Sequence, residues 1–413
     1  MRRVRQAERI DLRRARVGRG ASTAATTALR GRRILATGDR RFARKTPNDP
    51  RYREQWHYST IRAPEAWDVI AEALLSAGDN LAVRLLACGA LATVQDRGRL
   101  GALRWGVGVA GAMDAPALAG GNLLVGNPDD AAGIEIQVLP LEARFESEAV
   151  FAVTGADCTA VLDGVPVLPW TVARARAGAT LRLDRPAAFR PWGARTYLCV
   201  AGGIDVPVVL GSRATQLRVA IGGLEGRSLQ AGDALPLGRP AGDPPPPGTG
   251  LVPPVLALPL AVGGVPALRV LPAAEHDRYT TDSLAAFWGE PWRVTPQSDR
   301  YGFRLAGSTL VPLAPMELRS HGIVPGVIQV PHGGQPIIQM CDAQPSGGYP
   351  KIGTVIEADL WRLAQAPIGA RIRFVETDWD GALAARDAID GWLKAGVASK
   401  VLKGQFDTLP VFA

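Results

Sequence analysis

Residues 134–164, IEIQVLPLEARFESEAVFAVTGADCTAVLDG, contain short apolar and β-branched runs in quick succession. Turn residues separate the runs, and Asp163-Gly164 is a typical tight-turn pair. The same texture continues as far as RTYLCVAGG at residues 195–203. Strands this short and this closely spaced indicate a β-rich barrel or sandwich, because parallel βαβ units need longer intervening helices. We therefore predict a mainly β (α+β) fold with a few short helices.

The second half of the chain repeats this texture after a proline-rich break. Residues 238–262 contain four consecutive prolines and can form neither a helix nor a central strand, so we predict an extended linker. Strand-like runs such as ALRVLP, GVIQVP and ARIRFVE follow it. We predict two β-rich lobes, at residues 83–237 and 263–376, and a C-terminal tail at 377–413 that contains a helix.

One helix is expected inside the first lobe, in the sequence DAPALAGGNLLVGN. Asp114 can cap it, and Pro116 suits its first turn. Residues 106–111 just upstream read GVGVAG, a formal G-x-G-x-x-G pattern. They follow LGALRW rather than a buried strand, and no βαβ alternation comes after them. We therefore predict a glycine-rich turn and no dinucleotide site. The sequence also lacks a P-loop.

Charge is distributed unevenly along the chain. Residues 1–45 hold 15 Lys or Arg and three acids, a local charge of +12, so the rest of this +8 chain sums to −4. The body is mildly acidic, and we predict no nucleic-acid binding. Residues 46–69 resemble the edge of a subtilisin-like protease, but no triad motif follows. We predict that residues 1–80 are a disordered or spurious extension outside the functional domain at 83–376.

Cysteine content and hydropathy indicate in which cellular compartment the protein is expected. The four cysteines lie far apart and include no C-x-x-C pair, which argues against a zinc site or a disulfide framework. No stretch reaches the roughly 18 apolar residues of a membrane span, and no secretory signal is recognisable. No His, Asp and Glu cluster has metal-ligand spacing. We expect a cytoplasmic protein without a metal site or membrane contact.

Residues 93–99, TVQDRGR, place an amide, a carboxylate and two guanidiniums beside a turn glycine. An arginine fork suits a carboxylate or a carboxyphosphate-like anion, so Gln95 and Arg99 are candidate binding residues. The alternative is a structural Asp–Arg pair that closes the turn.

The densest polar stretch covers residues 317–353, where side chains that bind ligands or relay protons alternate with apolar strand residues. Its glycine pairs allow close approach of backbone N–H groups to a small molecule. We predict one pocket there, reached also by Gln95 or Arg99 and lined by Gln335, Asp342, Gln344 and Tyr349. Alternatively, His321 and His332 are solvated loop residues, and Gln339 faces solvent as part of strand alternation.

Several of these stretches occur in the order that is typical of one family. They include TVQDRGRLG, GVGVAGAMDAPALAGGNLLVGN, YLCVAGGIDVPVVLGSRATQLR, GIVPGVIQVPHGGQPI and DAQPSGGYPKIGTVIEADLWRLAQ. From about Val83 to about Glu376 the chain resembles the C subunits of 5-oxoprolinases, also called KipA-like proteins or allophanate hydrolase subunit 2, in the biotin-dependent carboxyltransferase family. The resemblance implies two cyclophilin-like β-barrel lobes and ATP-dependent opening of 5-oxoproline to glutamate.

The resemblance also implies partners and cofactors. A KipI-like B subunit and a further A subunit would complete the enzyme, and ATP would act through that complex. A biotinyl-lysine segment is missing from the sequence, so biotin, if used, must arrive on a separate carrier. Two departures concern substrate identity: Pro345-Ser346 replaces the family's usual Thr-Thr, and Tyr301 follows Arg300 where Met or Thr is usual.

Opening a lactam needs donors for the developing oxyanion and a proton acceptor. Arg99, Lys351 and glycine-loop amides would donate, and Asp342 or His321 would accept the proton. The predicted catalytic residues are Asp342, His321 and Lys351. The predicted substrate-binding residues are Gln95, Arg99, Asp114, Arg300, Gln329, Gln335, Gln344, Gly347, Gly348 and Tyr349.

Two other functions stay open at this point. One is a biotin-dependent carboxyltransferase that acts on urea or a similar amide. The other is a non-catalytic, KipA-like regulatory binding protein. As one subunit of an ATP-dependent amide hydrolase, the chain is expected to be inactive alone.

Overall fold

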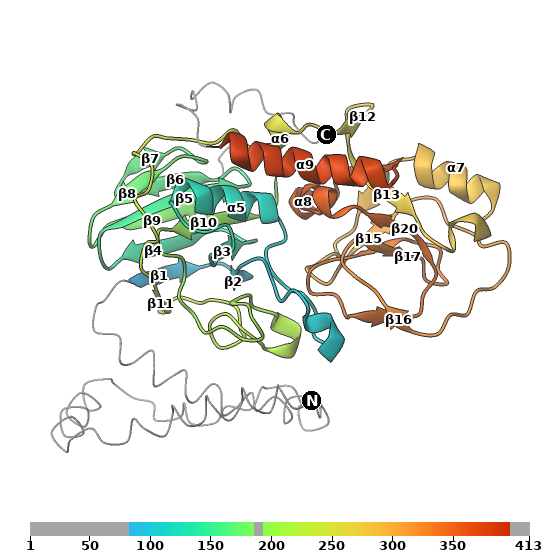
Figure 1. Cartoon of the computed structure of the whole chain (residues 1–413), viewed down its shortest axis with the longest axis horizontal. Coiled ribbons are helices and arrows are strands. Elements are labelled where there is room, and N and C mark those ends of the chain that lie inside the picture. Colours follow the sequence, from blue (N-terminus) through green and yellow to red (C-terminus); the bar gives the residue numbers. More distant parts are fainter. Residues whose placement is uncertain (1–81, 186–192, 397–413) are drawn as a thin grey trace, which may run out of the picture. The chain divides into compact units, whose positions relative to one another are not determined.

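A computed structural model describes residues 82–185 and 193–396. The predicted extension at 1–80 and the end of the predicted tail lie outside the described residues. Two groups of strands fill the described part, and we call them the first lobe, residues 82–236, and the second lobe, residues 261–376 (Figure 1). The predicted mainly β fold is confirmed.

The first lobe is built from two antiparallel sheets. One has the order β11-β1-β4-β9-β6-β7 and the other β2-β3-β10-β5-β8. The strands are β1 (Ala82–Cys88), β2 (Ala92–Gln95), β3 (Gly133–Ile136), β4 (Leu141–Phe145), β5 (Ala149–Gly155), β6 (Thr159–Leu162), β7 (Val165–Val167), β8 (Ala173–Ala175), β9 (Thr180–Asp184), β10 (Thr196–Val200) and β11 (Ala234–Pro236).

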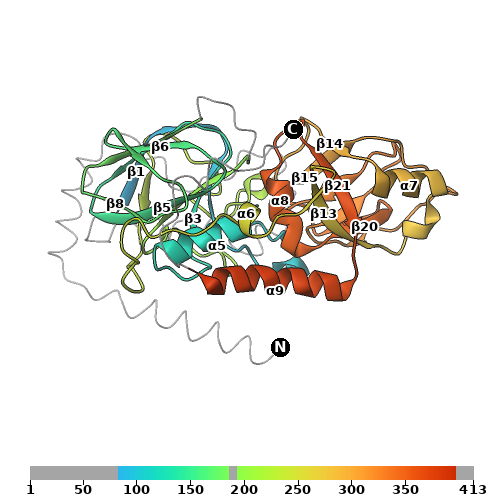
Figure 2. The same ribbon diagram turned by 90° about the horizontal axis from the view of Figure 1, so that it is seen from above.

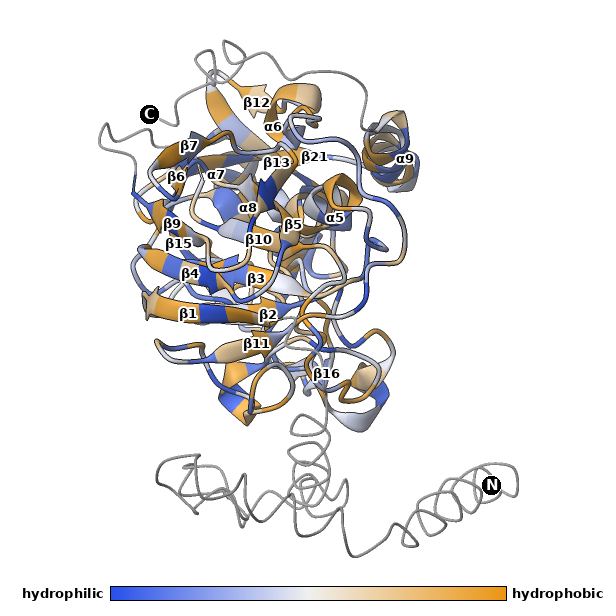
Figure 3. Ribbon diagram, turned by 90° about the vertical axis from the view of Figure 1, so that its left-hand side faces the viewer, coloured by the Kyte–Doolittle hydropathy of each residue, from blue (hydrophilic) through white to orange (hydrophobic). Residues whose placement is uncertain are grey.

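Side-chain alternation explains why these runs form sheets. In β4, Leu141, Ala143 and Phe145 are buried, whereas Glu142 and Arg144 between them are partly exposed. A strand with this period of two buries one face against the opposite sheet and leaves the other face toward water. Figure 3 shows the same alternation of hydrophobic and hydrophilic residues along β4. The buried faces of the two sheets form one hydrophobic core.

The second lobe is a closed barrel. Its strand order is β12-β13-β20-β17-β18-β15-β14-β21, and a parallel pairing of β13 with β21 closes seven of these strands into a ring. The strands are β12 (Ala261–Val262), β13 (Val265–Pro272), β14 (Trp292–Val294), β15 (Gly302–Ala306), β17 (Val327–Gln329), β18 (Ile337–Gln339), β20 (Lys351–Val355) and β21 (Arg371–Glu376). A separate two-stranded sheet pairs β16 (His321–Gly322) with β19 (Ser346–Gly347).

Short helices fill connections between these strands, one of them inside the linker at 238–262 that was predicted to contain no helix, and a longer helix follows β21. They are η3 (Ala102–Trp105), α5 (Ala115–Leu124), η4 (Leu217–Val219), α6 (Pro254–Ala257), η5 (His276–Arg278), α7 (Thr281–Gly289), η6 (Glu357–Asp359), α8 (Leu360–Gln365) and α9 (Trp379–Ala395). The Oδ1 atom of Asp114 accepts a hydrogen bond from the N–H of Ala117 at 2.9 Å, so the predicted cap of α5 is confirmed. None of the helices in the described ranges is long and apolar enough to cross a membrane.

The long helix α9 contacts both lobes (Figure 2). Toward its C-terminal end, Trp392 packs edge-on against Trp170 of the first lobe, and its indole N–H donates to the carbonyl of Val252. Nearer its start, Ala385 lies in a small apolar cluster with Ile356 and Ala358 after β20. The helix therefore braces the two lobes along one side.

Candidate functional site

Arg300 stands at the centre of a buried polar cluster. It lies just before β15, and its Nε and Nη2 atoms donate to the two carboxylate oxygens of Asp342, each at 3.0 Å. The two side chains are only 8% and 7% exposed. This two-pronged geometry is the strong form of an ion pair, because both partners are held in one orientation.

The same guanidinium reaches the first lobe. Its Nη1 atom donates to Oε1 of Glu135 in β3, and Nη2 donates to the carbonyl of Gly111 at 2.7 Å. Glu135 also accepts hydrogen bonds from the N–H of Met113 and the hydroxyl of Tyr197. One arginine thus joins a carboxylate of each lobe, which fixes the two lobes against each other at this point.

Burial and charge act in opposite directions on these carboxylates. Burial works against ionisation of Glu135, but Arg300 and Arg195 outweigh it and hold the pKa of Glu135 below its usual value. For Asp342, burial is the stronger influence and raises the pKa despite the contact with Arg300. Asp342 is therefore the more readily protonated of the two carboxylates that flank Arg300.

A second interlobe contact involves Gln365 at the end of α8. Its Nε2 atom donates to Oδ2 of Asp114 at 2.7 Å and to the carbonyl of Arg195 at 2.9 Å. Its Oε1 atom accepts from the N–H groups of Ala194 and Arg195. Burial raises the pKa of Asp114 to about 7. Asp114 was predicted to bind substrate, but here its oxygens are occupied by the helix cap and by Gln365.

Arg99 is fully buried and incompletely satisfied. Its Nη2 atom donates to the carbonyl of Ala214, whereas Nε and Nη1 have no hydrogen-bond partner among the described residues. Burial lowers the pKa of Arg99, and the carboxylates of Asp96 and Asp342 oppose that effect. A Cβ atom at Gly222 would lie 2.0 Å from Nη2, so this glycine makes room for the guanidinium.

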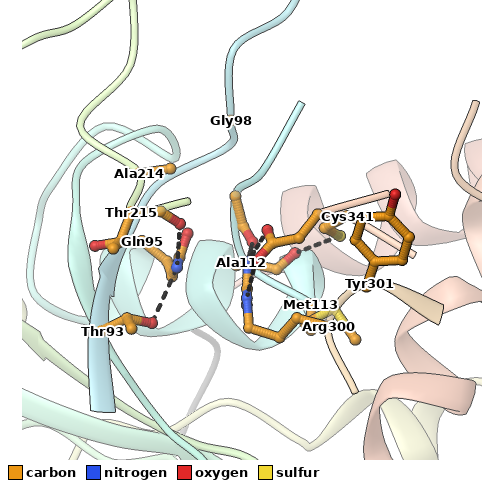
Figure 4. A network of polar contacts seen from close by, with 12 residues as sticks. Thr93, Gln95, Gly98, Ala112, Met113, Ala214, Thr215, Arg300, Tyr301 and Cys341 are labelled. Carbon is orange, nitrogen blue, oxygen red and sulfur yellow. Dashed lines mark hydrogen bonds and ion pairs between the residues drawn. The ribbon is translucent and has the colours of Figure 1, made fainter. Parts of the chain in front are cut away.

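Gln95, the last residue of β2, lies shortly before Arg99 in the sequence and is also buried. Like Arg99, it has a polar atom without a hydrogen-bond partner within the described ranges. Its Nε2 atom donates to Oγ1 of Thr93 and to the carbonyl of Thr215, as Figure 4 shows, but Oε1 has no partner in the part of the chain that is described. Buried donors and acceptors without partners are rare in native proteins. The free donors of Arg99 and the free acceptor of Gln95 are therefore groups that a polar or anionic ligand would satisfy.

Asp96 has a structural role in the TVQDRGR motif, but it does not form the Asp–Arg pair given as the alternative. Its Oδ1 atom accepts from the hydroxyl of Ser212 and the N–H of Gly98, both at 2.7 Å, and Oδ2 accepts from the N–H of Arg213. Asp96 thus closes a turn with two backbone N–H groups and a serine hydroxyl rather than with an arginine side chain. The fixed turn holds Arg99 in place.

The remaining predicted residues have contacts of their own. The Oε1 atom of Gln335 accepts a hydrogen bond from the N–H of Gly307 at 3.0 Å, and its Nε2 atom donates to the Gly307 carbonyl at 3.2 Å. The ammonium of Lys351 lies 3.5 Å from a carboxylate oxygen of Glu275. His321 is exposed, and its Nδ1 atom lies 2.8 Å from the carbonyl of Arg319.

Two further predicted residues lie at the surface. Gln344 is exposed, and Tyr349 is half-exposed with its ring edge-on to His332. Within residues 82–185 and 193–396, none of Gln335, Gln344 and Tyr349 forms a hydrogen bond or ion pair with Asp342.

Sequence reasoning missed several members of the cluster. Glu135 gave a signal, a charged residue inside the strand-like run IEIQVL, and the structure buries it completely. Gln339 was given a solvent-facing position as an alternative, but it is buried, and its Nε2 atom donates to Oε1 of Gln329 at 3.0 Å. The sequence around Arg195 and Gln365 gave no comparable signal, because their importance depends on the meeting of two lobes.

An open cavity of about 510 Å³ lies elsewhere, on the first lobe. It shares Asp96 and Gly98 with the turn before Arg99 but does not include Arg300 or Asp342. Of the three arginines in its wall, Arg97 and Arg213 are already paired with carboxylates, and the third is Arg239. We place the candidate site at the buried cluster instead, because the donors of Arg99 that are unpartnered among the described residues act there on Asp342, a carboxylate with a raised pKa.

In the described ranges, no group of three or more His, Cys, Asp and Glu side chains is arranged to hold a metal ion. The four cysteines are free. The thiol of Cys341 lies 3.7 Å from the carbonyl of Ala112, a contact that Figure 4 draws, and burial raises its pKa to about 12. Such a thiol stays protonated and is a poor nucleophile.

Comparison with known proteins gives a consistent result. The family described as "Carboxyltransferase domain, subdomain A and B" matches residues 105–376. The chain is 45% identical over 312 residues to the C subunit of 5-oxoprolinase from Escherichia coli (strain K12), covering 74% of this chain and 94% of that protein.

More distant similarity extends to urea amidolyases. The chain is 30% identical to the urea amidolyase of Saccharomyces cerevisiae over 76% of its own length, which is only 18% of that protein. The crystal structure of K. lactis urea amidolyase matches with a TM-score of 0.69 and 26% identity. That match covers 86% of this chain and 23% of the yeast chain. These matches confirm the resemblance predicted from the sequence motifs.

Proposed function

We propose that this chain, which belongs to the carboxyltransferase domain family, is the C subunit of an ATP-dependent 5-oxoprolinase. With a KipI-like B subunit and an A subunit, it would open 5-oxo-L-proline to L-glutamate. The proposal is supported by 45% identity along nearly the whole of a protein with that name. It makes the chain one component of an amide hydrolase rather than a complete enzyme.

The chemistry of this reaction sets clear requirements. The lactam C–N bond breaks, the carbonyl carbon gains an oxygen from one water molecule, and the nitrogen gains a proton. A second water molecule is consumed as ATP is converted to ADP and phosphate. A lactam carbonyl is a weak electrophile, so negative charge that develops on its oxygen must be stabilised by fixed donors. Water must also lose a proton to a nearby base.

One observation carries the assignment of roles: Arg99 is fully buried, and two of its donor nitrogens are free among the described residues. In our proposal, these nitrogens bind the oxygen on which charge develops, or the substrate carboxylate. Asp342 accepts the proton, which its raised pKa favours, and Arg300 positions it. His321 and Lys351 are second choices, because their contacts are with Arg319 and Glu275 and not with the buried cluster around Arg300.

ATP is assigned to the complex rather than to this chain, because the sequence has no P-loop. The glycines Gly347 and Gly348, with Gln344 and Tyr349, remain proposed contacts for substrate from the loop after Asp342. Gln335 is the weakest member of the proposed set, since both polar atoms of its amide are held by Gly307.

The similarity to urea amidolyases supports a second candidate, a carboxyltransferase that acts on urea. Free guanidinium nitrogens on Arg99 suit the carboxylate of carboxybiotin as well as they suit a lactam oxygen. Biotin would have to arrive on another chain, because no biotinyl-lysine segment is present in the sequence.

The two candidates are separated by an assay of the purified chain to which the A and B subunits are added one at a time. We expect ATP-dependent glutamate formation from 5-oxo-L-proline only in the full complex. Glutamate formation by this chain alone would show that it is a complete enzyme and not one component of a complex. A full complex that makes no glutamate, but consumes carboxybiotin in the presence of urea, would establish the carboxyltransferase instead.

A further inference from the structure

Two buried glutamines form a hydrogen-bonded pair on the outer face of the second-lobe barrel. Gln329 is the last residue of β17, and Gln339 is the last residue of β18. Their neighbours Ile328 and Ile338 belong to the barrel core. Because successive side chains in a strand point to opposite faces, both glutamines point away from that core.

Each amide of the pair keeps one polar atom without a partner. Gln339 Nε2 donates to Gln329 Oε1, which leaves Gln329 Nε2 and Gln339 Oε1 unpartnered among the described residues. The residues are only 2% and 4% exposed, so the free atoms do not reach bulk water. If both amides are turned over, the result is the same: one bond between two amides always leaves one donor and one acceptor.

The short strand β19 packs against the glutamine pair. Gly347 in β19 is buried, and a Cβ atom at this position would lie 2.5 Å from Gln329 Nε2. A larger residue at this position would push the end of the Gln329 side chain aside. The sheet to which Gly347 belongs consists of two residue pairs, His321 with Gly347 and Gly322 with Ser346. So small a sheet opens at low cost compared with the barrel beneath it.

The pair lies on the same strand ladder as the Arg300–Asp342 ion pair. Gln339 is paired with Gly302, and the ladder continues through hydrogen bonds from Met340 N–H to the Tyr301 carbonyl and from Asp342 N–H to the Arg300 carbonyl. Asp342 follows Gln339 by three residues, in the turn just beyond the end of β18. The glutamine pair and the proposed proton acceptor therefore lie on one connected segment of the second lobe.

We propose that Gln329 and Gln339 recognise a cis amide: the free Nε2 atom donates to its carbonyl oxygen, and the free Oε1 atom accepts from its N–H. A lactam ring presents these two groups on one edge, whereas a trans peptide bond holds them on opposite sides. The pair would thus select lactams against linear peptides. This inference rests on the proposed function, since it names the residues that select its substrate.

The test compares two ligands on the same protein. Binding of 5-oxo-L-proline to the full complex is measured by calorimetry beside 3-oxocyclopentane-1-carboxylate, which keeps the carbonyl and carboxylate but has CH₂ in place of N–H. An acceptor left without its partner costs about 10- to 100-fold in affinity, so the native complex should prefer the lactam by that factor. In Gln339→Met the preference should fall to within about threefold of unity.

A matched exchange, Gln230→Met on an exposed turn of the first lobe, should retain the native preference. The double variant Gln329→Met/Gln339→Met should melt no lower than the native chain, because it removes both unsatisfied atoms together. The preference is a ratio of two affinities on one sample, so partial misfolding of a variant does not change it.

The outcomes separate the inference from the proposed function. If the native complex binds lactam and ketone equally, or if Gln339→Met keeps the full preference, the glutamine pair does not bind the amide group of the substrate. If the complex binds the lactam selectively but forms no glutamate, recognition stands and the proposed reaction is wrong.

Discussion

The structure changes the effect on stability that is expected from replacing Asp342. From the sequence, replacing it with alanine should stop turnover and leave the melting temperature nearly intact. The structure changes the second part, because Asp342 is the two-pronged partner of a buried guanidinium. Asp342→Ala should lower the free energy of unfolding by about 3–5 kcal/mol, the usual effect of stranding a buried charge.

The matched control for this prediction is Asp129→Ala. Asp129 pairs with Arg97 at the surface, where both side chains are 56% exposed, and such pairs contribute about 0–1 kcal/mol. Denaturant titration of both variants gives the comparison. Equal losses would mean that Glu135 and Gly111 satisfy Arg300 without Asp342.

Arg99 should behave in the opposite way. Its guanidinium is buried with two donors unused among the described residues, so Arg99→Met removes an unfavourable burial and keeps the volume of the side chain. We expect the free energy of unfolding to stay constant or rise by about 1 kcal/mol, while kcat/KM of the complex falls by about 100-fold or more. A loss of stability without a loss of activity would identify Arg99 as a structural residue.

Residue chemistry could be predicted from the sequence only in part. Arg99 and Asp342 were predicted as site residues because they stand near turn glycines and prolines, where polar side chains often serve a site. Glu135 is separated from Arg300 by 165 positions, so no local pattern could show that the two would meet.

At the scale of elements, the residue that caps helix α5, Asp114, makes the stability of the folded chain depend on pH. Burial raises the pKa of Asp114 from an ordinary value of 3.8 to about 7. The folded chain therefore holds a proton that the unfolded chain releases, and the free energy of unfolding falls as pH rises from about 4 to 7. The size of this decline is on the order of 2–4 kcal/mol.

Asp114→Asn removes the titration and should flatten this part of the stability curve. Its amide nitrogen will face the Gln365 amide, which cannot turn over because its oxygen already binds Ala194 and Arg195. This contact lowers the absolute stability at every pH, so the slope between pH 4 and 7 is the quantity to measure. A parallel slope in both proteins would assign the response to another group.

Element prediction succeeded where local rules are sufficient. The cap of α5 follows from Asp114 and Pro116, and strand periodicity indicated the sheets. The two-residue strands β16 and β19 were not predicted, because their pairing depends on tertiary position rather than on a run of β-forming residues.

At the scale of the molecule, α9 lies beyond the residues that match the family, which end at 376. Trp392→Ala should nevertheless lower the free energy of unfolding by about 3–5 kcal/mol, because this ring packs on Trp170 in the core of the first lobe. Trp379→Ala on the same helix is the control, since Trp379 is 74% exposed. Similar losses for the two would show that α9 is not a brace.

The mainly β architecture could be predicted from the sequence because short alternating runs restrict the number of compatible folds. The way in which the lobes meet could not, since it depends on single long-range contacts such as Gln365 with Asp114.

The parallel pairing of β13 with β21 has a consequence for synthesis on the ribosome. The barrel needs Ala267–Val270 and Arg373–Glu376 side by side, so its seam must wait until translation has passed the last of these codons. The strands of the first lobe are complete much earlier, by Pro236. During translation, an N-terminal unit can fold while the unit behind it is still incomplete. A ribosome that stalls between these two points would therefore release a folded first lobe that carries an open, aggregation-prone half-barrel.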